Sequence, residues 1–279
     1  MPCENVFVHI GMSKSGSSAI QKCLMDNRDV LEKSGISYPK IGMPGNDGTA
    51  HHDIRSDLER GSASLLRRAI NGSNSDAVIL SCEGFWLLDD GQLELMARAL
   101  SQGEVEVILY LRNPHDYLPS SYRQNIKRAG ENCSPEEYFN PHRPNLKQDF
   151  SYQLERWSQY FSLRVRAYEA VKHSIEKVFM RAIGAPVDRV DTSRRVVNTT
   201  PSDGAIWLMR LANRHLPSRA SRRVRRLIKS PDYDFDFLPS IEDDVFHDYA
   251  DRIIERWDVD VIREHLPGGD WHQLVGTDE

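Results

Sequence analysis

The sequence predicts an α/β fold in which helices flank a mostly parallel sheet, followed by a helical C-terminal third. Short apolar, β-branched runs alternate with helical patterns, and they fall at residues 6–10, 77–80, 105–111 and 163–168. Such alternation is typical of βαβ units, whose strands run parallel. From Ser202 onward the apolar residues follow helical spacing. Because the chain shows no internal repeat, we expect a single domain over residues 1–279.

The remaining elements have local signals of their own. After the first strand, Ser18 and Gln21 fit a capping box, and the apolar stripe that follows predicts one helix that ends near Gly35. Residues 36–38 predict a further short strand, and the Gly- and Pro-rich residues 39–50 predict a loop. Ser134 and Glu137 form a second capping box, which predicts a short helix.

Composition limits the classes of function. The formal net charge of −5 gives no reason to expect nucleic acid as a partner, so any anion site must be local. The four cysteines form no C-x-x-C pair, which predicts free thiols rather than a zinc site or a disulfide framework. No apolar run reaches the ~18 residues of a membrane span, and the N-terminus lacks the pattern of a signal peptide. We therefore expect a cytoplasmic protein without a transmembrane segment.

The loop after the first strand carries the clearest signal for an anion site. Residues 11–18 read Gly-Met-Ser-Lys-Ser-Gly-Ser-Ser and lead from the strand into a helix. N–H groups at a helix start favour an anion, Gly16 lets the backbone approach it, and the hydroxyls of Ser17 and Ser18 add hydrogen bonds. A nucleoside-triphosphate loop places its lysine directly after the second glycine, whereas Lys14 precedes Gly16. The alternative is a strand–turn–helix corner with an exposed lysine.

A second pattern follows the strand at residues 105–111. Arg112 ends this strand, and Pro114 suits the first turn of the next helix. An arginine at the carboxyl end of a strand points into the crevice where open α/β sheets bind ligands. Ser120 would lie about two helical turns further on and could return toward the same anion. The alternative is a structural helix start with a surface serine.

These two segments resemble the sulfotransferase superfamily. Lys14, Gly16, Ser17 and Ser18 match its pattern K-x-G-[ST]-[ST], and His9, Ile10 and Gly11 are similar to the H-I-G of bacterial carbohydrate-type members. Arg112 and Ser120 match the second pattern, R-N-P-(x)5-S, although Pro119 departs from it and is expected to distort the helix. Tyr168 and Glu169 look like the Y-E that ends a later strand of the family. The resemblance spans roughly residues 5–215, and its two co-substrate motifs are the specific part.

The resemblance implies a P-loop-like sheet and 3′-phosphoadenosine 5′-phosphosulfate (PAPS) as co-substrate. The loop residues Lys14, Ser15, Gly16, Ser17 and Ser18 would cradle the 5′-phosphosulfate. Arg112 and Ser120 would bind the 3′-phosphate. Arg195 and Asn198 stand where a basic loop of the family closes over the co-substrate.

The chemistry of sulfuryl transfer assigns further roles. Charge grows on the leaving oxygen, and Lys14 would stabilise it. The acceptor hydroxyl needs a general base, for which Glu83, His51 and His52 all remain candidates. The alternatives are an ion pair for Glu83 and a solvated loop for the histidines. A sulfuryl group carries less charge than a phosphoryl group, so we expect no metal.

The acceptor and the oligomeric state remain open. A carbohydrate or a glycolipid hydroxyl fits the resemblance, so the acceptor would be a glycan or lipid-linked. The basic run at residues 214–229 could grip an acidic glycan or a phospholipid head group, or be neutralised by the acidic run at 232–248. Two other functions are considered: a nucleotide-dependent kinase of related fold, and a non-catalytic nucleotide-binding protein.

Overall fold

The computed structural model describes residues 3–12, 14–45, 48–139, 149–192, 201–228, 235, 238–239 and 244–276. The chain divides into two compact units. The sheet unit comprises Met1–Asn113, Phe150–Val197 and Trp257–Glu279, and the helical unit comprises Pro114–Asp149 and Asn198–Arg256. That the two form a single functional domain stays a prediction.

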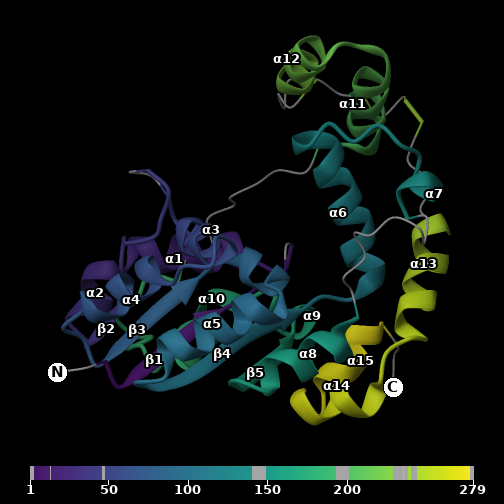
Figure 1. Ribbon diagram of the computed structural model, residues 1–279. Coiled ribbons are helices and arrows are strands. Elements are labelled where there is room, and N and C mark those ends of the chain that lie inside the picture. The colour runs from purple at the N-terminus through teal and green to yellow at the C-terminus, as the bar shows by residue number, and fades with distance from the viewer. Residues whose placement is uncertain are drawn as a thin grey trace. The chain divides into compact units, whose positions relative to one another are not determined.

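Five parallel strands form the sheet, in the order β2-β3-β1-β4-β5 (Figure 1). They are β1 (Asn5–His9), β2 (Ile36–Ser37), β3 (Ala77–Ser81), β4 (Glu104–Leu111) and β5 (Ser162–Ala167). Each strand begins and ends within one residue of its predicted bounds. The α/β prediction with a parallel sheet is therefore confirmed.

Helices follow the strands along the chain and pack on the sheet (Figure 1). They are α1 (Ser17–Asp26), α2 (Arg28–Glu32), α3 (His52–Glu59), α4 (Ser64–Asn71), the 3₁₀ helix η1 (Glu83–Leu87), α5 (Asp90–Leu100), α8 (Phe150–Ser158), α9 (Tyr168–Val171), α10 (Ile175–Ala182), α14 (Val259–His265) and α15 (Asp270–Val275).

Both faces of the sheet are buried. On one face, strand residues pack with α1 and α10 in a single apolar cluster that includes Ile20, Leu24, Ile79, Ile108 and Phe179. Successive side chains of a strand point to opposite faces. The alternate residues Val78, Leu80, Val107 and Leu109 are nevertheless also buried. The continuous apolar runs of the strands follow from this burial on both faces.

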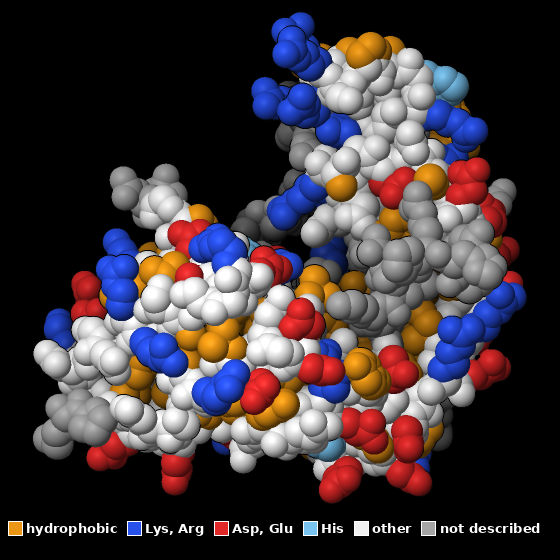
Figure 2. Space-filling model, in the orientation of Figure 1, with side chains coloured by type: hydrophobic (Ala, Val, Ile, Leu, Met, Phe, Trp, Pro, Cys, Tyr) orange, Lys and Arg blue, Asp and Glu red, His pale blue; other side chains and the backbone are white. Residues whose placement is uncertain are grey.

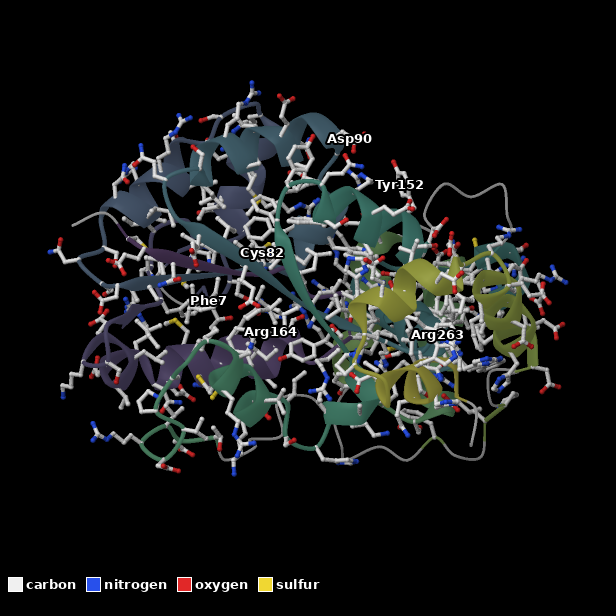
Figure 3. All side chains as sticks on the ribbon, turned by 90° about the horizontal axis from the view of Figure 1, so that it is seen from below. Phe7, Cys82, Asp90, Tyr152, Arg164 and Arg263 are labelled. Atoms are coloured by element: carbon white, nitrogen blue, oxygen red, sulfur yellow. The ribbon has the colours of Figure 1, made fainter. Side chains whose placement is uncertain are left out.

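The C-terminal helices of the sheet unit stabilise the end of β5. Asp270 at the start of α15 accepts hydrogen bonds from Arg166 Nε at 2.7 Å and from the Ala167 N–H at 2.8 Å. Arg263 of α14 stacks on Trp271 of α15, with 4.8 Å from its guanidinium carbon to the ring centroid (Figure 3). Arg164, on the outer strand β5 in the same view, pairs with Glu106 of β4.

The helical unit contains α6 (Pro114–Arg128), α7 (Pro135–Tyr138), α11 (Asp203–His215), α12 (Ser218–Ile228) and α13 (Asp244–Ile254). Its core includes Leu118, Tyr122, Phe139, Ile206 and Phe246, all of them buried. Every described element after residue 201 is a helix, which confirms the predicted helical C-terminal third. In the described part of the chain, no helix is long and apolar enough to cross a membrane.

The starts and ends of three helices show where the local predictions succeed and where they fail. The predicted capping box at Ser18 is wrong, because α1 begins at Ser17 with Gly16 as N-cap and no side-chain cap. The single helix predicted to end near Gly35 is broken at Asn27 into α1 and α2. Helix α6 continues past Pro119 to Arg128, so this proline does not end the helix. The capping box of Ser134 and Glu137 is confirmed.

Candidate active site

The carboxyl ends of the parallel strands meet at one edge of the sheet. The segments after β1, β3, β4 and β5 therefore all leave the sheet at that edge. From β1 the chain passes to β2 and β3 on one side, whereas β4, on the other side of β1, leads to β5. Open α/β sheets bind ligands at such a reversal, outside the carboxyl ends. We therefore take the edge between β1 and β4 as the candidate active site.

The β1–α1 loop is shaped by its own hydrogen bonds. Ser15 is fully buried, and its hydroxyl donates to the Met12 carbonyl oxygen at 2.7 Å. The Ser17 hydroxyl donates to the same carbonyl at 3.3 Å. Lys14 has φ 69°, and among the described residues no other non-glycine adopts this left-handed conformation. Such a conformation costs a lysine ~1–2 kcal/mol, and strain of this kind concentrates at functional sites.

The start of α1 offers backbone N–H groups to an anion. Among the described residues, the N–H groups of Gly16, Ser17 and Ser18 have no hydrogen-bond acceptor. The helix dipole adds positive potential at the same point. Gly16 has φ 82°, and a Cβ there would lie 2.7 Å from Ile175 Cδ1. The loop thus presents the backbone N–H groups that anion sites at helix starts use.

Arg112 joins this loop to the end of β4. Its Nη1 donates to the Lys14 carbonyl oxygen at 2.7 Å. Its guanidinium carbon lies 5.4 Å from the centroid of the Tyr168 ring, and its Nε lies 3.8 Å from Glu169 Oε1. The Arg112 side chain is 18% exposed. The structure therefore places Arg112 of the second motif against Lys14 of the first.

Tyr168 and Glu169 complete this edge of the sheet. They begin α9, directly after β5. A second oxygen of Glu169, Oε2, accepts from the Asn113 N–H at 3.1 Å. Glu169 therefore fixes both the side chain of Arg112 and the backbone that follows it. The sequence identified this pair through resemblance alone, since nothing local reveals that it contacts Arg112.

His9, the last residue of β1, is buried next to the loop. It is fully buried, and its Nδ1 lies 2.8 Å from Ser81 Oγ, which also accepts from Gln21 Nε2 at 3.2 Å. Burial lowers the pKa of His9 to about 3, so the ring is neutral. A Cβ at Gly11 would lie 2.7 Å from His9 Nε2, which explains the glycine at that position. Sequence reasoning missed Ser81 and Gln21, because their contacts join three separate elements.

His51 is buried with both ring nitrogens bound to backbone. Its Nδ1 accepts from the Ser81 N–H at 3.0 Å, and its Nε2 donates to the Pro39 carbonyl oxygen at 2.9 Å. Burial lowers the pKa of His51 to about 4. This arrangement favours a structural role for His51 over that of a general base.

His52 and Glu83 lie close to the same cysteine. His52 is exposed at the start of α3, and its Nδ1 lies 3.4 Å from Cys82 Sγ. Glu83 directly follows Cys82 and is half-buried. In the described structure its carboxylate has no hydrogen-bond or ion-pair partner. The Cys82 N–H donates to the His9 carbonyl oxygen at 3.0 Å, so this segment lies beside the end of β1. Both candidate bases thus belong to the edge that carries the loop.

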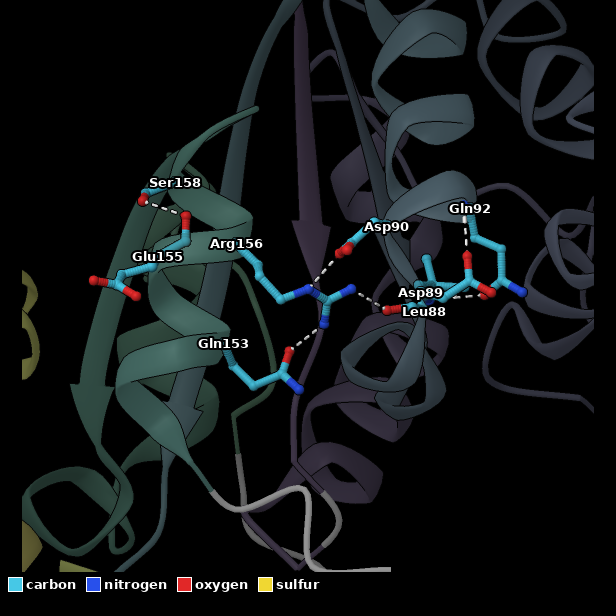
Figure 4. Close-up of polar contacts among 8 residues, drawn as sticks. All are labelled: Leu88, Asp89, Asp90, Gln92, Gln153, Glu155, Arg156 and Ser158. Carbon is cyan, nitrogen blue, oxygen red and sulfur yellow. Dashed lines mark hydrogen bonds and ion pairs between the residues drawn. The ribbon is translucent and has the colours of Figure 1, made fainter. Parts of the chain in front are cut away.

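The far end of η1, the helix that Glu83 begins, is fixed by Arg156 of α8 (Figure 4). Arg156 Nη2 donates to the Leu88 carbonyl oxygen at 2.8 Å, and its Nε donates to Asp90 Oδ1 at 2.7 Å. Asp89 caps α5 by accepting from the Gln92 N–H at 2.9 Å. The segment that follows Glu83 therefore has a defined path.

For the other predicted site residues, a position at this edge stays a prediction. Ser120 lies half-buried in α6 of the helical unit. Arg195 and Asn198 lie outside the described residues. Their roles toward the co-substrate stay predictions.

A groove of about 1370 Å³ lies at the opposite edge of the sheet. It is lined by residues at the amino ends of the strands, such as Asn5, Ala77, Glu104 and Ser162. It contains no residue of the loop or of the candidate bases. Because open α/β sheets bind ligands at the carboxyl edge, we do not assign the site to this groove.

No protein-family model and no curated protein matches the chain. Among solved structures, the chain is similar to a sulfotransferase from Alicyclobacillus acidocaldarius, with 18% sequence identity and a TM-score of 0.46. The match covers 80% of this chain and 100% of the other. By its name, that protein belongs to the superfamily that the two motifs resemble.

Proposed function

We propose that this protein is a sulfotransferase that moves a sulfuryl group from PAPS to a hydroxyl of a carbohydrate or glycolipid. The observation that supports it best is the hydrogen bond between Arg112 and the Lys14 carbonyl oxygen at 2.7 Å. It joins two motifs that lie 98 residues apart in the sequence. Each motif resembles the part of the family site that binds one end of the same nucleotide.

The residues at the β1–β4 edge suit a phosphosulfate group. Three N–H groups at the start of α1 need an acceptor, and an anion supplies it. Lys14 adds a cation within the loop. Arg112 and Ser120 would bind the 3′-phosphate, and Arg195 and Asn198 would close over the co-substrate. Arginine is suited to phosphate because its planar guanidinium donates two parallel hydrogen bonds.

The proposed reaction uses the residues of this edge in distinct roles. The acceptor oxygen attacks sulfur while the bond from sulfur to the bridging oxygen of the phosphate breaks. Negative charge grows on that bridging oxygen, and Lys14 stabilises it. Glu83 or His52 takes the proton of the attacking hydroxyl. We keep His51 as a third candidate base, although its contacts favour a structural role.

The direct test is transfer of labelled sulfuryl groups from PAPS to a panel of glycans and glycolipids. We expect transfer by the wild-type protein and by Lys177→Ala, a matched loss of an exposed lysine on α10. Lys14→Ala should lower the rate of transfer by at least ~10²-fold. Magnesium-dependent phosphoryl transfer from ATP without any sulfuryl transfer would overturn the proposal in favour of a kinase. Nucleotide binding without transfer to any acceptor would instead indicate a non-catalytic binding protein.

A further inference from the structure

Helix α12 presents a row of arginines to solvent. It contains five arginines and no acidic residue, although the whole chain has a net charge of −5. The exposed members are Arg219, Arg222, Arg223 and Arg226. Figure 2 shows Lys and Arg side chains gathered over α12, at the top of the view.

The periodicity of the helix places these arginines on one face. At 3.6 residues per turn, the four exposed arginines fall within less than half of the helix circumference. Ser221, Arg225 and Ile228 lie on the opposite face and are buried. Arg225 Nη1 donates to Ser221 Oγ and to Asn213 Oδ1 of α11, so the buried face is tied to the helical unit. The outward face, which we call the basic face, consists of the four exposed arginines.

The charge of the basic face is not neutralised in the described part of the chain. None of its four guanidinium groups has an acidic partner there, and Arg222 donates to the Ser218 carbonyl of its own helix. Arginines at spacings of three and four residues repel one another, which disfavours the helix. An external anionic surface would relieve this repulsion.

Exposed leucines lie on α12, just before it and on the preceding helix α11. Leu227 of α12 is 65% exposed, beside Arg223 and Arg226. Leu216, which precedes α12, is 41% exposed, and Leu211 of α11 is 38% exposed. Arginine side chains bind lipid phosphates, and leucines enter the boundary between head groups and acyl chains. An acidic polysaccharide would leave the leucines in water.

We infer that the basic face, with Leu227 and Leu216, docks on the surface of an anionic phospholipid membrane. The basic charge is complementary to anionic head groups, and the leucines match the apolar layer beneath them. This is peripheral binding and needs no membrane-spanning helix. It goes beyond the proposed sulfotransferase function, because none of these residues is among those proposed to bind the co-substrate.

Co-sedimentation with lipid vesicles tests this inference. We expect the full-length protein to bind vesicles of phosphatidylcholine mixed with phosphatidylglycerol, and to bind phosphatidylcholine alone far more weakly. Binding should fall steeply as salt is raised, since salt screens the attraction. The double variant R222E/R223E should weaken binding by at least ~30-fold. Leu227→Ser should weaken it by ~5-fold.

The matched control is R67E/R68E, which makes the same charge change on exposed residues of α4 in the sheet unit. It should bind vesicles like the wild type, and R222E/R223E should keep the wild-type circular dichroism spectrum and nucleotide affinity. Equal losses in the two double variants would overturn the inference, because net charge alone would then explain binding. So would equal affinity for both kinds of vesicle, or binding to heparin without binding to vesicles. The salt dependence of wild-type binding tests the same claim without any substitution.

Discussion

The candidate active site and the basic face of α12 use positive charge in different ways. At the site, Arg112 is largely buried and is held by the Lys14 carbonyl and by Glu169. On α12, the four arginines of the basic face extend into solvent without an acidic partner among the described residues. Fixed cations recognise one small anion in a defined geometry, whereas exposed cations recognise a charged surface. Substitutions at the site should therefore have large and specific effects, and those on α12 smaller effects that depend on salt.

The largest effect is expected from the general base. Glu83→Gln should keep normal nucleotide affinity and lower kcat by ~10²–10⁴-fold, because the acceptor hydroxyl would keep its proton. His52→Ala and His51→Ala serve as controls in the same steady-state assay. If Glu83→Gln turns over normally and one histidine variant is inactive, the base is that histidine. Full activity in all three variants would place the base elsewhere.

Lys14 should separate catalysis from stability. Lys14→Ala should lower kcat by at least ~10²-fold, since it withdraws the cation from the leaving oxygen. The backbone of Lys14 has the left-handed conformation, with φ 69°. Lys14→Gly should therefore be as inactive as Lys14→Ala and yet more stable than it by up to ~1 kcal/mol, because glycine adopts this conformation without strain. Kinetics and denaturant unfolding measure the two effects. Equal stability of the two variants would argue against a strained loop.

Alanine substitutions at two glycines compare the candidate site with a position outside it. Gly16 and Gly61 share a left-handed conformation, with φ 82° and 77°. A Cβ at Gly16 would lie 2.7 Å from Ile175 Cδ1, whereas one at Gly61 would meet nothing within 4 Å. Gly16→Ala should therefore lower nucleotide affinity by ~10–100-fold. Gly61→Ala should share the backbone strain and bind normally. Equal affinities in calorimetry would remove the loop from the binding site.

The buried histidines predict a dependence of stability on pH. Burial lowers the pKa of His51 from 6.5 to about 4 and the pKa of His9 from 6.5 to about 3. Below pH 6.5 the unfolded chain binds protons that the folded protein does not. The free energy of unfolding should therefore decrease as the pH is lowered below 6.5. The decrease should be ~1.4 kcal/mol per pH unit for each histidine, down to about pH 4. His51→Gln should reduce this slope in denaturant unfolding, and the exposed His215→Gln should not. An unchanged slope in His51→Gln would contradict the buried, neutral ring.

The strands and the two motifs could be identified from short stretches of the sequence. The strands are continuous apolar runs because both faces of the sheet are buried, and this signal is contained in each segment. The loop that we propose to bind the anion could also be identified from the sequence, since its lysine, glycine and hydroxyls follow one another in the chain. Ser134 and Glu137 cap their helix through neighbours three residues apart, so their box was predicted too.

The features that the sequence did not reveal depend on contacts between distant segments of the chain. Helix α1 ends at Asn27. The side chain of Asn27 donates to the carbonyl oxygen of Cys23 and also to the carbonyl oxygen of Asp191, which lies on a distant segment. His51 looks like a loop residue in the sequence, but the carbonyl of Pro39 and the N–H of Ser81 hold it in the core. The anchoring of Arg112 by Glu169 likewise depends on the pairing of β4 with β5.

The central claim is that the β1–β4 edge binds the nucleotide of PAPS, with Arg112 reading its 3′-phosphate. The most direct measurement is calorimetric titration with adenosine 3′,5′-bisphosphate and adenosine 5′-monophosphate, in the presence of a chelator. The wild-type protein should bind the bisphosphate without magnesium, and Arg112→Ala should weaken that binding by ~10–150-fold while barely changing affinity for the monophosphate. Strict dependence on magnesium, a preference for ATP, or equal losses for both nucleotides would contradict the claim.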